Sequence, residues 1–426
     1  MIKRKLINEL KSHLHAKEIS LIVGPRQAGK TTLMKELMGF LEQQGQKTLF
    51  LNLDYDTDKI HFSTQSALIN KLNLELGSNP GYVFIDEIQR KENAGLFLKG
   101  IYDHELKHKF IVSGSGSLEL KEKIHESLAG RKRLFELNPL SFEEFANHKT
   151  SYRYENKLGD FFSIEKEQSA ALLNEYMNFG GYPRVVLEDK IREKTMLIDE
   201  IYRSYVEKDI AYLLKIDKPE SFSKMLKLLS SQVSGLLNYS ELASKSGISV
   251  PTLRHYLWYA EKTFIINLIS PHFTNRLKEI TKSPIAYFTD LGMRNYMIGL
   301  FGNLQNPAEV GHVFQNFVHN ILHERFAYSP ASLHYWRTID RAEVDFVIKK
   351  GESVMPLEVK FSSLKKTEVG RSFHSFIEKY DPPEAIIVNL DLKTELIIKN
   401  TVVKFIPFYE LISYDFSGNT IFTQTS

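Results

Sequence analysis

A short stretch near the start of the chain constrains the fold more than any other feature. Residues 18–43, EISLIVGPRQAGKTTLMKELMGFLEQ, predict a strand over Ile19–Val23, a loop bounded by glycines, and a helix from about Lys30. Apolar residues recur in that helix at helical spacing, namely Leu33, Met34, Leu37 and Leu41. Four further strands follow before residue 140, and their alternation with helical segments predicts an α/β domain with a parallel sheet.

The loop itself, Gly24-x-x-x-x-Gly29-Lys30-Thr31-Thr32, fits the pattern of a phosphate-binding P-loop. Its small residues let backbone N–H groups curl around nucleotide phosphates, while Lys30 reaches the terminal phosphates and Thr31 ligates Mg²⁺. The N-terminus of the following helix adds a favourable dipole field. We therefore expect ATP and Mg²⁺ as ligands, with a binding set of Gly24, Pro25, Arg26, Gln27, Ala28, Gly29, Lys30, Thr31 and Thr32.

Two acids follow a second apolar strand, Tyr82–Ile85, in the segment YVFIDEIQR. Asp86 is expected to bind Mg²⁺, directly or through water, and Glu87 to orient and activate the attacking water as a general base. Another strand ends in KFIVSGSGS, where Ser113 or Ser115 is placed to sense the γ-phosphate or position the water. With Lys30, these residues form the predicted catalytic set of a nucleoside triphosphatase.

The composition is that of an ordinary globular protein with more than one domain. A length of 426 residues fits two to four domains. The chain has no cysteine, which excludes disulfides and thiolate zinc sites. The N-terminal segment does not read as a signal peptide, and no run approaches about 20 apolar residues. We therefore expect a cytoplasmic protein without a membrane partner. The net charge of +3 is too small to indicate nucleic acid by itself.

The order of these motifs resembles an AAA-type ATPase. In that family the helix before the fifth strand ends with an arginine finger, which reaches the nucleotide of a neighbouring subunit. ESLAGRKR stands at that position, so the resemblance assigns the finger to Arg131, or else to Arg133. Such an arginine stabilises charge on the transferring phosphoryl group, whereas the alternative role is to cap a helix C-terminus. The resemblance implies a homo-oligomer, such as a hexameric ring, in which Arg131 acts in trans.

A more specific resemblance covers nearly the whole chain. It is carried by GPRQAGKTTL, FIDEIQR, SGSGSLEL, LAGR, ELNPLSFEEF, NFGGYPRVV, YVEKDIAYL and YFTDLGMRNYMIG. These motifs are similar to those of a bacterial and archaeal ATPase family. Its members join an AAA-type domain to a C-terminal domain long labelled as of unknown function, and most are named only as ATPases.

The middle of the chain predicts helices. Residues 149–234 have helical periodicity with a break at Gly180-Gly181, and a long amphipathic helix is expected over 193–214. These helices are most simply a connector between the ATPase domain and the C-terminal modules.

A helix-turn-helix is predicted next, in NYSELASKSGISVPTLRHYLWYAEKTFIINLISPH. Ser240 is expected to cap the first helix, Gly247 to form the turn and Ser249 to cap the second helix. A strand in FIINLISPH would then enter a wing. The module either packs against its own ATPase domain or a partner, or binds DNA, in which case the contacts come from Thr252, Arg254 and His255.

Near the C-terminus, EVDFVIKKGESVMPLEVKFSS predicts a hairpin. Alternation places Val344, Phe346 and Ile348 on one face and the acids on the other. A two-residue turn with Gly351 first then sets Asp345 opposite Glu358. Like charges directly opposite are unfavourable, so we expect compensation by a divalent cation, by Lys360 or by a raised carboxyl pKa.

The Asp…Glu-x-Lys arrangement resembles the core of the PD-(D/E)xK nucleases. The resemblance implies that Asp345 and Glu358 hold Mg²⁺ and that Lys360 positions or activates water for phosphodiester attack. An upstream helix in the ATPase family commonly carries Glu-Asn, whereas this chain has Gln315-Asn316, and Gln supplies no negative charge. An active nuclease, a nuclease-like fold that only binds DNA, and a plain solvated hairpin all stay open.

These inferences combine into one architecture of class α/β. We expect an AAA-type P-loop domain over 1–148, a helical connector over 149–234, a winged helix over 235–304, a restriction-endonuclease-like domain over 305–412 and a tail over 413–426. The leading hypothesis is an ATP-hydrolysing, ring-forming protein that acts on duplex or branched DNA. The alternatives are a nucleotide-switched signalling or defence ATPase whose C-terminal domain binds a partner, and an ATP-gated, metal-dependent DNA nuclease.

Overall fold

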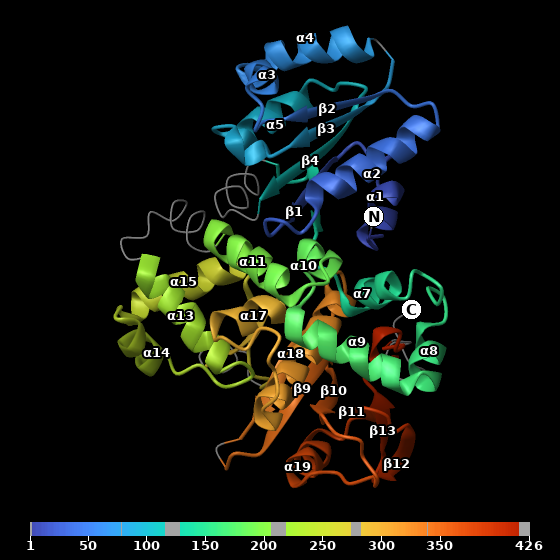
Figure 1. Ribbon diagram of the computed structural model, residues 1–426, viewed down its shortest axis with the longest axis vertical. Coiled ribbons are helices and arrows are strands. Elements are labelled where there is room, and N and C mark those ends of the chain that lie inside the picture. Colours follow the sequence, from blue (N-terminus) through green and yellow to red (C-terminus); the bar gives the residue numbers. More distant parts are fainter. Residues whose placement is uncertain are drawn as a thin grey trace. The chain divides into compact units, whose positions relative to one another are not determined.

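The computed structural model describes residues 2–77, 79–115, 128–205, 219–273, 283–338 and 340–416. The chain divides into two compact units (Figure 1). The first unit comprises Met1–Leu140, Tyr182–Ser223 and His255–Ile265, and the second comprises Ser141–Gly181, Lys224–Arg254 and Ile266–Ser426. The domain bounds inferred from the sequence stay a prediction. Three expected features fall largely outside the described residues: the helix before the fifth strand, the helix beyond residue 205 with its YVEKDIAYL motif, and the tail.

The first unit contains the predicted parallel sheet. Its strands are β1 (Ile19–Gly24), β2 (Thr48–Asn52), β3 (Tyr82–Asp86), β4 (Lys109–Ser115) and β5 (Lys132–Glu136). Their order is β2-β3-β4-β1-β5, and every neighbouring pair is parallel. Because parallel strands run the same way, the carboxyl ends of β1, β3 and β4 lie at one edge of the sheet.

Helices cover both faces of this sheet. The helical elements of the first unit are α1 (Leu6–Ser12), α2 (Lys30–Gln43), α3 (Asp56–Lys59), η1 (Ile60–Phe62), α4 (Gln65–Leu76), η2 (Ile88–Arg90), α5 (Ala94–Asp103), α10 (Pro183–Leu187) and α11 (Ile191–Tyr202), and neither core cluster of the sheet includes a residue of α10 or α11. Figure 1 shows α1 and α2 on one side and α3, α4 and α5 on the other. Ile22 of β1 packs with α1 and α2, whereas Leu21 and Val23 pack with α4 and α5. All six β1 residues are therefore buried, as expected for a parallel strand between two helical layers.

The second unit is built on a mixed six-stranded sheet. Its order is β12-β13-β11-β10-β9-β8, in which β10–β11 and β11–β13 are parallel and the other pairs are antiparallel. The strands are β8 (Ser332–Arg337), β9 (Glu343–Lys350), β10 (Ser353–Val359), β11 (Glu384–Asn389), β12 (Thr394–Ile398) and β13 (Thr401–Pro407).

The second unit also contains helices from the middle and from the C-terminal part of the chain. They are α7 (Phe142–Lys149), α8 (Leu158–Ile164), α9 (Lys166–Phe179), α14 (Tyr239–Ser246), α17 (Leu291–Met297), α18 (Pro307–Phe326), α19 (Arg371–Tyr380) and η4 (Glu410–Ile412). Two more helices, α13 (Pro219–Ser231) and α15 (Val250–Lys262), begin in one unit and end in the other. A two-stranded antiparallel sheet pairs β6 (Ile266–Ile269) with β7 (Ile285–Phe288).

The helix-turn-helix is present, with one cap corrected. The side chain of Asn238, not of Ser240, accepts the backbone N–H of Glu241 and caps α14. Asn and Ser are comparable caps, and the cap at Asn238 puts Ser240 inside the first turn of the helix. Gly247 ends α14 in the left-handed conformation and Ser249 accepts the N–H of Thr252 at the start of α15, as predicted.

The C-terminal hairpin has the predicted register, but its alternation is broken. Pairs run from Ser353–Lys350 to Leu357–Phe346, where the ladder ends just before Asp345 and Glu358. On the other side of β9, the register with β8 shifts between His334 and Trp336. Val344 consequently packs in one cluster with Val347 instead of sharing a face with Phe346. The strict alternation predicted for this strand was therefore wrong, because a bulge re-aims the residues around Asp345.

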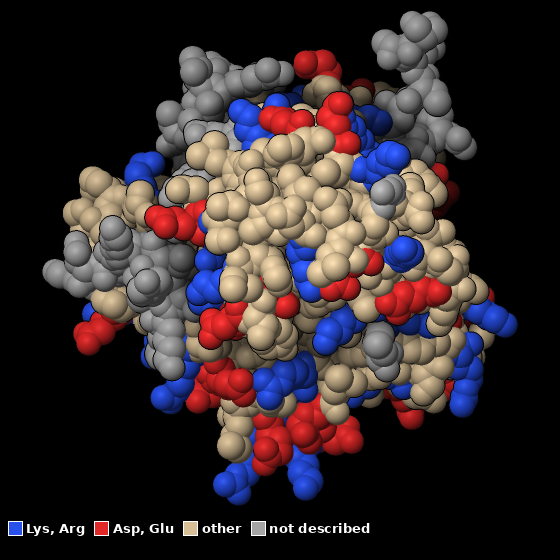
Figure 2. Space-filling model, turned by 90° about the horizontal axis from the view of Figure 1, so that it is seen from above, with Lys and Arg blue, Asp and Glu red and all other residues tan. Residues whose placement is uncertain are grey.

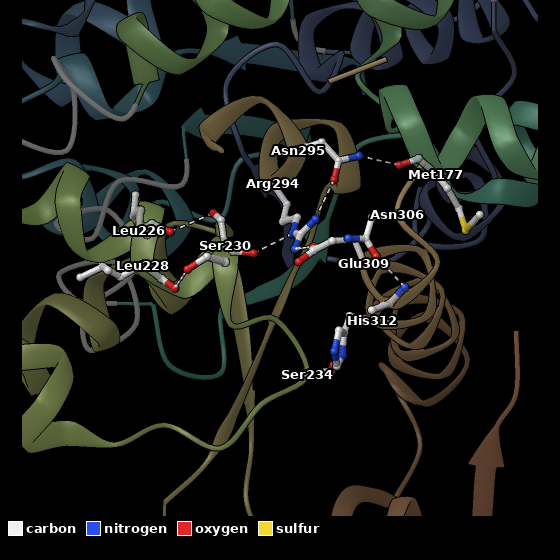
Figure 3. Close-up of polar contacts among 12 residues, drawn as sticks. Met177, Leu226, Leu228, Ser230, Ser234, Arg294, Asn295, Asn306, Glu309 and His312 are labelled. Carbon is white, nitrogen blue, oxygen red and sulfur yellow. Dashed lines mark hydrogen bonds and ion pairs between the residues drawn. The ribbon is translucent and has the colours of Figure 1, made fainter. Parts of the chain in front are cut away.

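Buried polar contacts join the helices of the second unit (Figure 3). Arg294 is 1% exposed and donates to the carbonyl oxygen of Ser230 at 2.8 Å and to Glu309 at 2.7 Å. Asn295 donates to the carbonyl oxygen of Met177 at 2.8 Å. A buried arginine is tolerated only when paired and hydrogen-bonded, so this network ties α9, α13, α17 and α18 together.

A second buried contact fixes the start of α17. Asp290 caps α17 through the N–H of Met293 and also accepts the N–H of Gly181, each at 2.7 Å. A Cβ added to Gly180 would lie 2.4 Å from the Asp290 carboxylate, and one added to Gly292 would lie 2.0 Å from the Phe179 carbonyl oxygen. Gly180 of NFGG and Gly292 of TDLG are therefore required by this close approach.

Asp290 predicts a pH dependence of stability. Burial raises its pKa from 3.8 to about 6. Between those values the folded chain holds a proton that the unfolded chain releases, so the free energy of unfolding falls as the pH rises, by about 3 kcal/mol in total. Urea unfolding from pH 4 to pH 7 checks this. In Asp290→Asn, which has no titratable group at this position, this part of the slope disappears. The exposed control Asp160→Asn keeps the wild-type slope, and identical slopes in the two variants would contradict the assignment.

Candidate functional site

The P-loop has its shape because two glycines leave room for backbone. A Cβ added to Gly24 would lie 2.0 Å from the carbonyl oxygen of Leu137, just past β5. Gly29 has φ of +98° directly before α2, a conformation that costs little only for glycine. The first N–H groups of α2 have no partner within the helix. The loop and the helix start therefore form a surface suited to an anion such as a phosphate.

Lys30 lies folded over this loop and is only 6% exposed. Its Nζ donates to the carbonyl oxygens of Gly24 at 3.0 Å and Pro25 at 2.9 Å. Burial lowers the pKa of Lys30 to about 8, an effect that the nearby Glu87 and Asp86 carboxylates oppose. A phosphate next to Nζ would favour the charged ammonium, so the arrangement suits a nucleotide whose phosphates replace the two carbonyl partners.

Three side chains meet at the carboxyl edge of the sheet. Thr31 Oγ1 donates to Asp86 Oδ2 at 2.7 Å, and Ser113 Oγ donates to the other oxygen of the same carboxylate. Asp86 itself is fully buried. Mg²⁺ prefers carboxylate and other oxygen ligands beside the phosphates of its nucleotide. The hydroxyl of Thr31 and the carboxylate of Asp86 therefore fit the predicted magnesium position, and Ser113 orients that carboxylate.

Glu87 stands one residue beyond, in a left-handed conformation with φ of +56°. Its backbone N–H lies 3.2 Å from Asp86 Oδ1, and its carboxylate accepts a hydrogen bond from Gln89. Burial, the largest cause, raises the pKa of Glu87. A carboxylate with a raised pKa is a better proton acceptor near neutral pH. The strained backbone and this electrostatic setting both suit the role of general base.

Two arginines at the P-loop were missed by the sequence reasoning. Arg4, just before α1, donates to the carbonyl oxygens of Ala28 at 2.7 Å and Asn138 at 2.6 Å. It therefore ties the P-loop to the segment that follows β5. Arg184 donates to the side chain of Gln27 at 3.0 Å and to Glu200 at 3.0 Å. The only sequence signal for Arg184 was its place in NFGGYPRVV, a motif to which no role had been assigned.

The predicted finger arginines lie at the opposite edge of the sheet. The carbonyl oxygen of Arg131 accepts the N–H of Ile19 at 2.9 Å, beside the amino end of β1. Its guanidinium pairs with Asp103 at 2.8 Å, while that of Arg133 lies 5.3 Å from the ring centre of Phe135. Neither arginine is thus at the edge that carries its own P-loop. Action in trans stays a prediction.

The acid pair of the second unit, Asp345 and Glu358, has contacts that differ from those of the acids at the P-loop. Asp345 Oδ2 accepts the N–H of Val359 at 2.8 Å, and burial raises the pKa of Asp345 to about 7. Lys360 pairs with Glu358 Oε1. The other oxygen of Glu358 is buried and has no hydrogen-bond partner among the described residues. Two of the three expected compensations are therefore present: Lys360 and a raised carboxyl pKa.

A third anionic ligand does not accompany this pair. Gln315 stands at the position where a glutamate could have been a further metal ligand, and its side chain donates to the Tyr287 hydroxyl at 3.0 Å. Over the described residues, no group of three or more His, Cys, Asp or Glu is arranged to hold a metal ion. Because Mg²⁺ can be held by two carboxylates and waters, metal binding by Asp345 and Glu358 stays a prediction.

The residues predicted to contact DNA lie along α15. Thr252 Oγ1 hydrogen-bonds Ser249 at 2.8 Å, which ties it to the cap. Arg254 is exposed, and its guanidinium lies 4.5 Å from the ring centre of Tyr239. His255 is exposed too and hydrogen-bonds the Tyr259 hydroxyl at 2.6 Å. Contact with DNA stays a prediction.

Known sequence families match the chain in three blocks. Residues 16–146 match the family described as AAA domain, and these residues form an AAA-type P-loop domain. Residues 170–304 and 310–411 match two families, each described as a domain of unknown function (DUF8612 and DUF4143). The resemblance to an AAA-type ATPase is therefore confirmed for the first block, and the descriptions of the other two name no activity.

Uncharacterised proteins from an archaeon and from bacteria are similar over most of the chain. One from Methanocaldococcus jannaschii is 25% identical over 92% of this chain and 86% of its own length. One from Mycobacterium tuberculosis is 26% identical over 88% and 76%, and one from Haemophilus influenzae is 25% identical over 82% and 84%. These relatives agree with the expected distribution in bacteria and archaea.

Solved structures resemble the chain only weakly. A replication initiator DnaA bound to AMPPCP and single-stranded DNA has 17% identity and a TM-score of 0.29, over 62% of this chain and 90% of that one. Cdc6p from Pyrobaculum aerophilum has 10% identity and a TM-score of 0.28, over 71% and 96%. Scores this low carry no argument about function. Within the described residues, no helix has the length and apolar character to cross a bilayer.

The position of Arg184 leads to a prediction about ATP binding that could not be made from the sequence. A cation held against the P-loop by Gln27 is placed to interact with the phosphates of a bound nucleotide, and hydrogen bonds to charged groups contribute about 1.5–3 kcal/mol. We expect Arg184→Ala to weaken ATP binding about tenfold or more in calorimetry. The control Arg192→Ala, an exposed arginine on α11, should bind ATP as the wild type does. Equal affinities for all three proteins would exclude a role for Arg184.

Proposed function

We propose that this protein is a Mg²⁺-dependent ATPase. The observation that carries the proposal is the hydrogen bond of 2.7 Å between Thr31 Oγ1 and Asp86 Oδ2. It joins the residue after the P-loop lysine to a fully buried acid at the end of β3, next to the loop that presents its N–H groups. A nucleotide-binding AAA domain over residues 16–146 supports the same conclusion.

Each residue of the site has a role in this proposal. Backbone N–H groups of the loop and of the start of α2, other than at Pro25, which has none, cradle the phosphates, and Lys30 reaches the terminal phosphates. Thr31 and Asp86 would hold Mg²⁺, which would supply positive charge to offset the negative charge on the transferring phosphoryl group. Glu87 Oε accepts the proton of the attacking water. Ser113 orients Asp86 and positions the water near Glu87.

We further propose that the ATPase is a ring-forming homo-oligomer that acts on duplex or branched DNA. In the ring, Arg131 of one subunit would complete the site of the next. The pairing of Arg131 and Arg133 with groups at the amino edge of the sheet supports action in trans, since neither serves its own P-loop. The exposed Arg254 and His255 on α15 support DNA as the partner. Figure 2 shows acidic and basic side chains interspersed over the face in view.

A second candidate is a nucleotide-switched signalling or defence ATPase, and a third is an ATP-gated DNA nuclease. The switch ATPase would use the second unit to bind a partner, without metal chemistry at Asp345 and Glu358. The nuclease would require a cation to join Asp345 and Glu358, with Lys360 acting on water. The buried, unpartnered oxygen of Glu358 is the one observation in its favour.

One assay series separates these functions. ATP turnover is measured with no DNA, duplex DNA and branched DNA, and the DNA of each sample is run on a gel. Lys30→Ala should lose nucleotide binding, because its ammonium holds the phosphates. Glu87→Gln should bind ATP and turn it over at least 100-fold more slowly, because the general base is lost. Normal turnover in either variant would show that the site is wrongly assigned.

The same samples identify the partner. Turnover stimulated by duplex or branched DNA supports the proposed DNA role, whereas no response to any DNA favours the switch. Nicking that needs Mg²⁺ and disappears in Asp345→Ala would establish the nuclease. The control Asp160→Ala, an exposed acid of the second unit, should leave every readout unchanged.

A further inference from the structure

A cavity of about 220 Å³ opens in the second unit, directly beyond the ends of three parallel strands. Phe361 follows β10, Leu390 follows β11 and Phe408 follows β13, and all three line the cavity. These strands are neighbours in the sheet and run in the same direction. In α/β sheets, ligands bind in the crevice outside the carboxyl ends of the parallel strands. The cavity therefore lies where such a sheet offers a binding site.

The floor of the cavity is apolar and aromatic. Phe162 and Phe408 lie in it with ring centres 6.2 Å apart, and Leu173 and Met177 of α9 close it from the other side. Each of these four side chains is at most 3% exposed. Aromatic rings and a thioether make favourable contacts with the face or edge of another flat ring. The floor thus suits a flat, unsaturated group.

The mouth of the cavity is polar, with one aromatic exception. Lys166, Asn174 and Asp391 line it and are exposed. Phe361 is 38% exposed at the same place, and its ring lies edge-on to Phe314 with centres 5.1 Å apart. Pockets for small groups combine an apolar interior with a few polar groups that set orientation. An exposed ring beside amide and carboxylate groups fits a ligand that is flat and has a hydrogen-bonding edge.

The chain beyond Phe361 is cationic. Residues 360–371, KFSSLKKTEVGR, carry Lys360, Lys365, Lys366 and Arg371 against a single acid, Glu368. Lys365, Lys366 and Arg371 are exposed. Only Phe361 and Ser363 of this segment line the cavity itself, so the exposed cations lie further along the chain that leaves its mouth. Lysine and arginine arranged in this way neutralise phosphates.

We propose that the cavity binds one unpaired base of a single-stranded nucleic acid, while residues 360–371 hold the adjoining phosphates. The proposal rests on the proposed DNA function and names the part of the DNA that the second unit recognises. The base stacks on Phe361 at the mouth and on the aromatic floor, and Asn174 and Asp391 hydrogen-bond its polar edge. An aromatic side chain of a protein partner would fill the floor but would leave this polar mouth and the cationic segment without a role. The base therefore explains more of the site.

The test uses the full-length protein and a fluorescein-labelled single strand with one 2-aminopurine. Anisotropy gives the affinity, and 2-aminopurine fluorescence reports stacking inside the cavity. Phe361→Ala removes the ring at the mouth, and Ala170→Trp, at an exposed position of α9 that lines the cavity, blocks it. We expect both variants to bind about tenfold more weakly and to lose the quenching, since stacking of one base on an aromatic residue is a large part of such binding. The control Tyr328→Ala removes an exposed ring elsewhere in the same unit and should behave as the wild type.

The outcomes separate this proposal from the DNA function itself. If the wild type binds no single-stranded, duplex or branched DNA, the DNA function and this proposal both fall. If DNA binds but Phe361→Ala and Ala170→Trp match the Tyr328→Ala control, with 2-aminopurine unquenched, only the cavity is wrongly assigned. A tryptophan-containing peptide that binds the wild type but not Ala170→Trp, without any quenching by the oligonucleotide, would assign the cavity to a protein partner instead.

Discussion

The parallel pairing of β1 with β4 and of β4 with β3 is the constraint on which the nucleotide site depends. It places the ends of three strands at one edge, so that Thr31, Asp86 and Ser113 meet although 82 residues separate the first from the last. Burial by helices on both faces holds that edge rigid, since neither layer of core can shift without exposing apolar surface. A rigid edge is what metal and phosphate positioning requires.

The second unit also brings the carboxyl ends of neighbouring parallel strands together at one edge of its sheet. Its parallel strands β10, β11 and β13 also end together, and the cavity forms at that edge. Of its acid pair, Asp345 of β9 has a raised pKa and Glu358 of β10 pairs with Lys360, while the second oxygen of Glu358 has no hydrogen-bond partner among the described residues. A bulge in β9 next to Asp345 shows how a small change of register re-aims side chains at such an edge. The two edges thus suit different tasks: one suits phosphoryl chemistry, and the other suits recognition.

Local signals predicted much of this structure, and most of the features that they did not predict depend on contacts between distant segments. The P-loop, its strand and its helix depend on adjacent residues, and the hairpin register follows from one glycine turn, so both were predictable from sequence. Arg4 and Arg184 reach the P-loop from distant segments, and no spacing rule connects them to Gln27 or Ala28. The bulge beside Asp345 depends on β8, a neighbour that the hairpin sequence does not contain. The cap of α14 was assigned to Ser240, but Asn238, two residues earlier, is a comparable cap and forms the bond.

The central claim is that Thr31 and Asp86 together hold Mg²⁺ beside the nucleotide, and Thr31→Ala tests it most directly. Calorimetry of ATP binding with Mg²⁺ and with EDTA separates metal binding from phosphate binding. The account predicts that Mg²⁺ strengthens ATP binding by the wild type, and that this gain is mostly lost in Thr31→Ala while metal-free binding is retained. If Mg²⁺ strengthens binding to the variant as much as to the wild type, the metal is held elsewhere and the assignment of this edge is wrong.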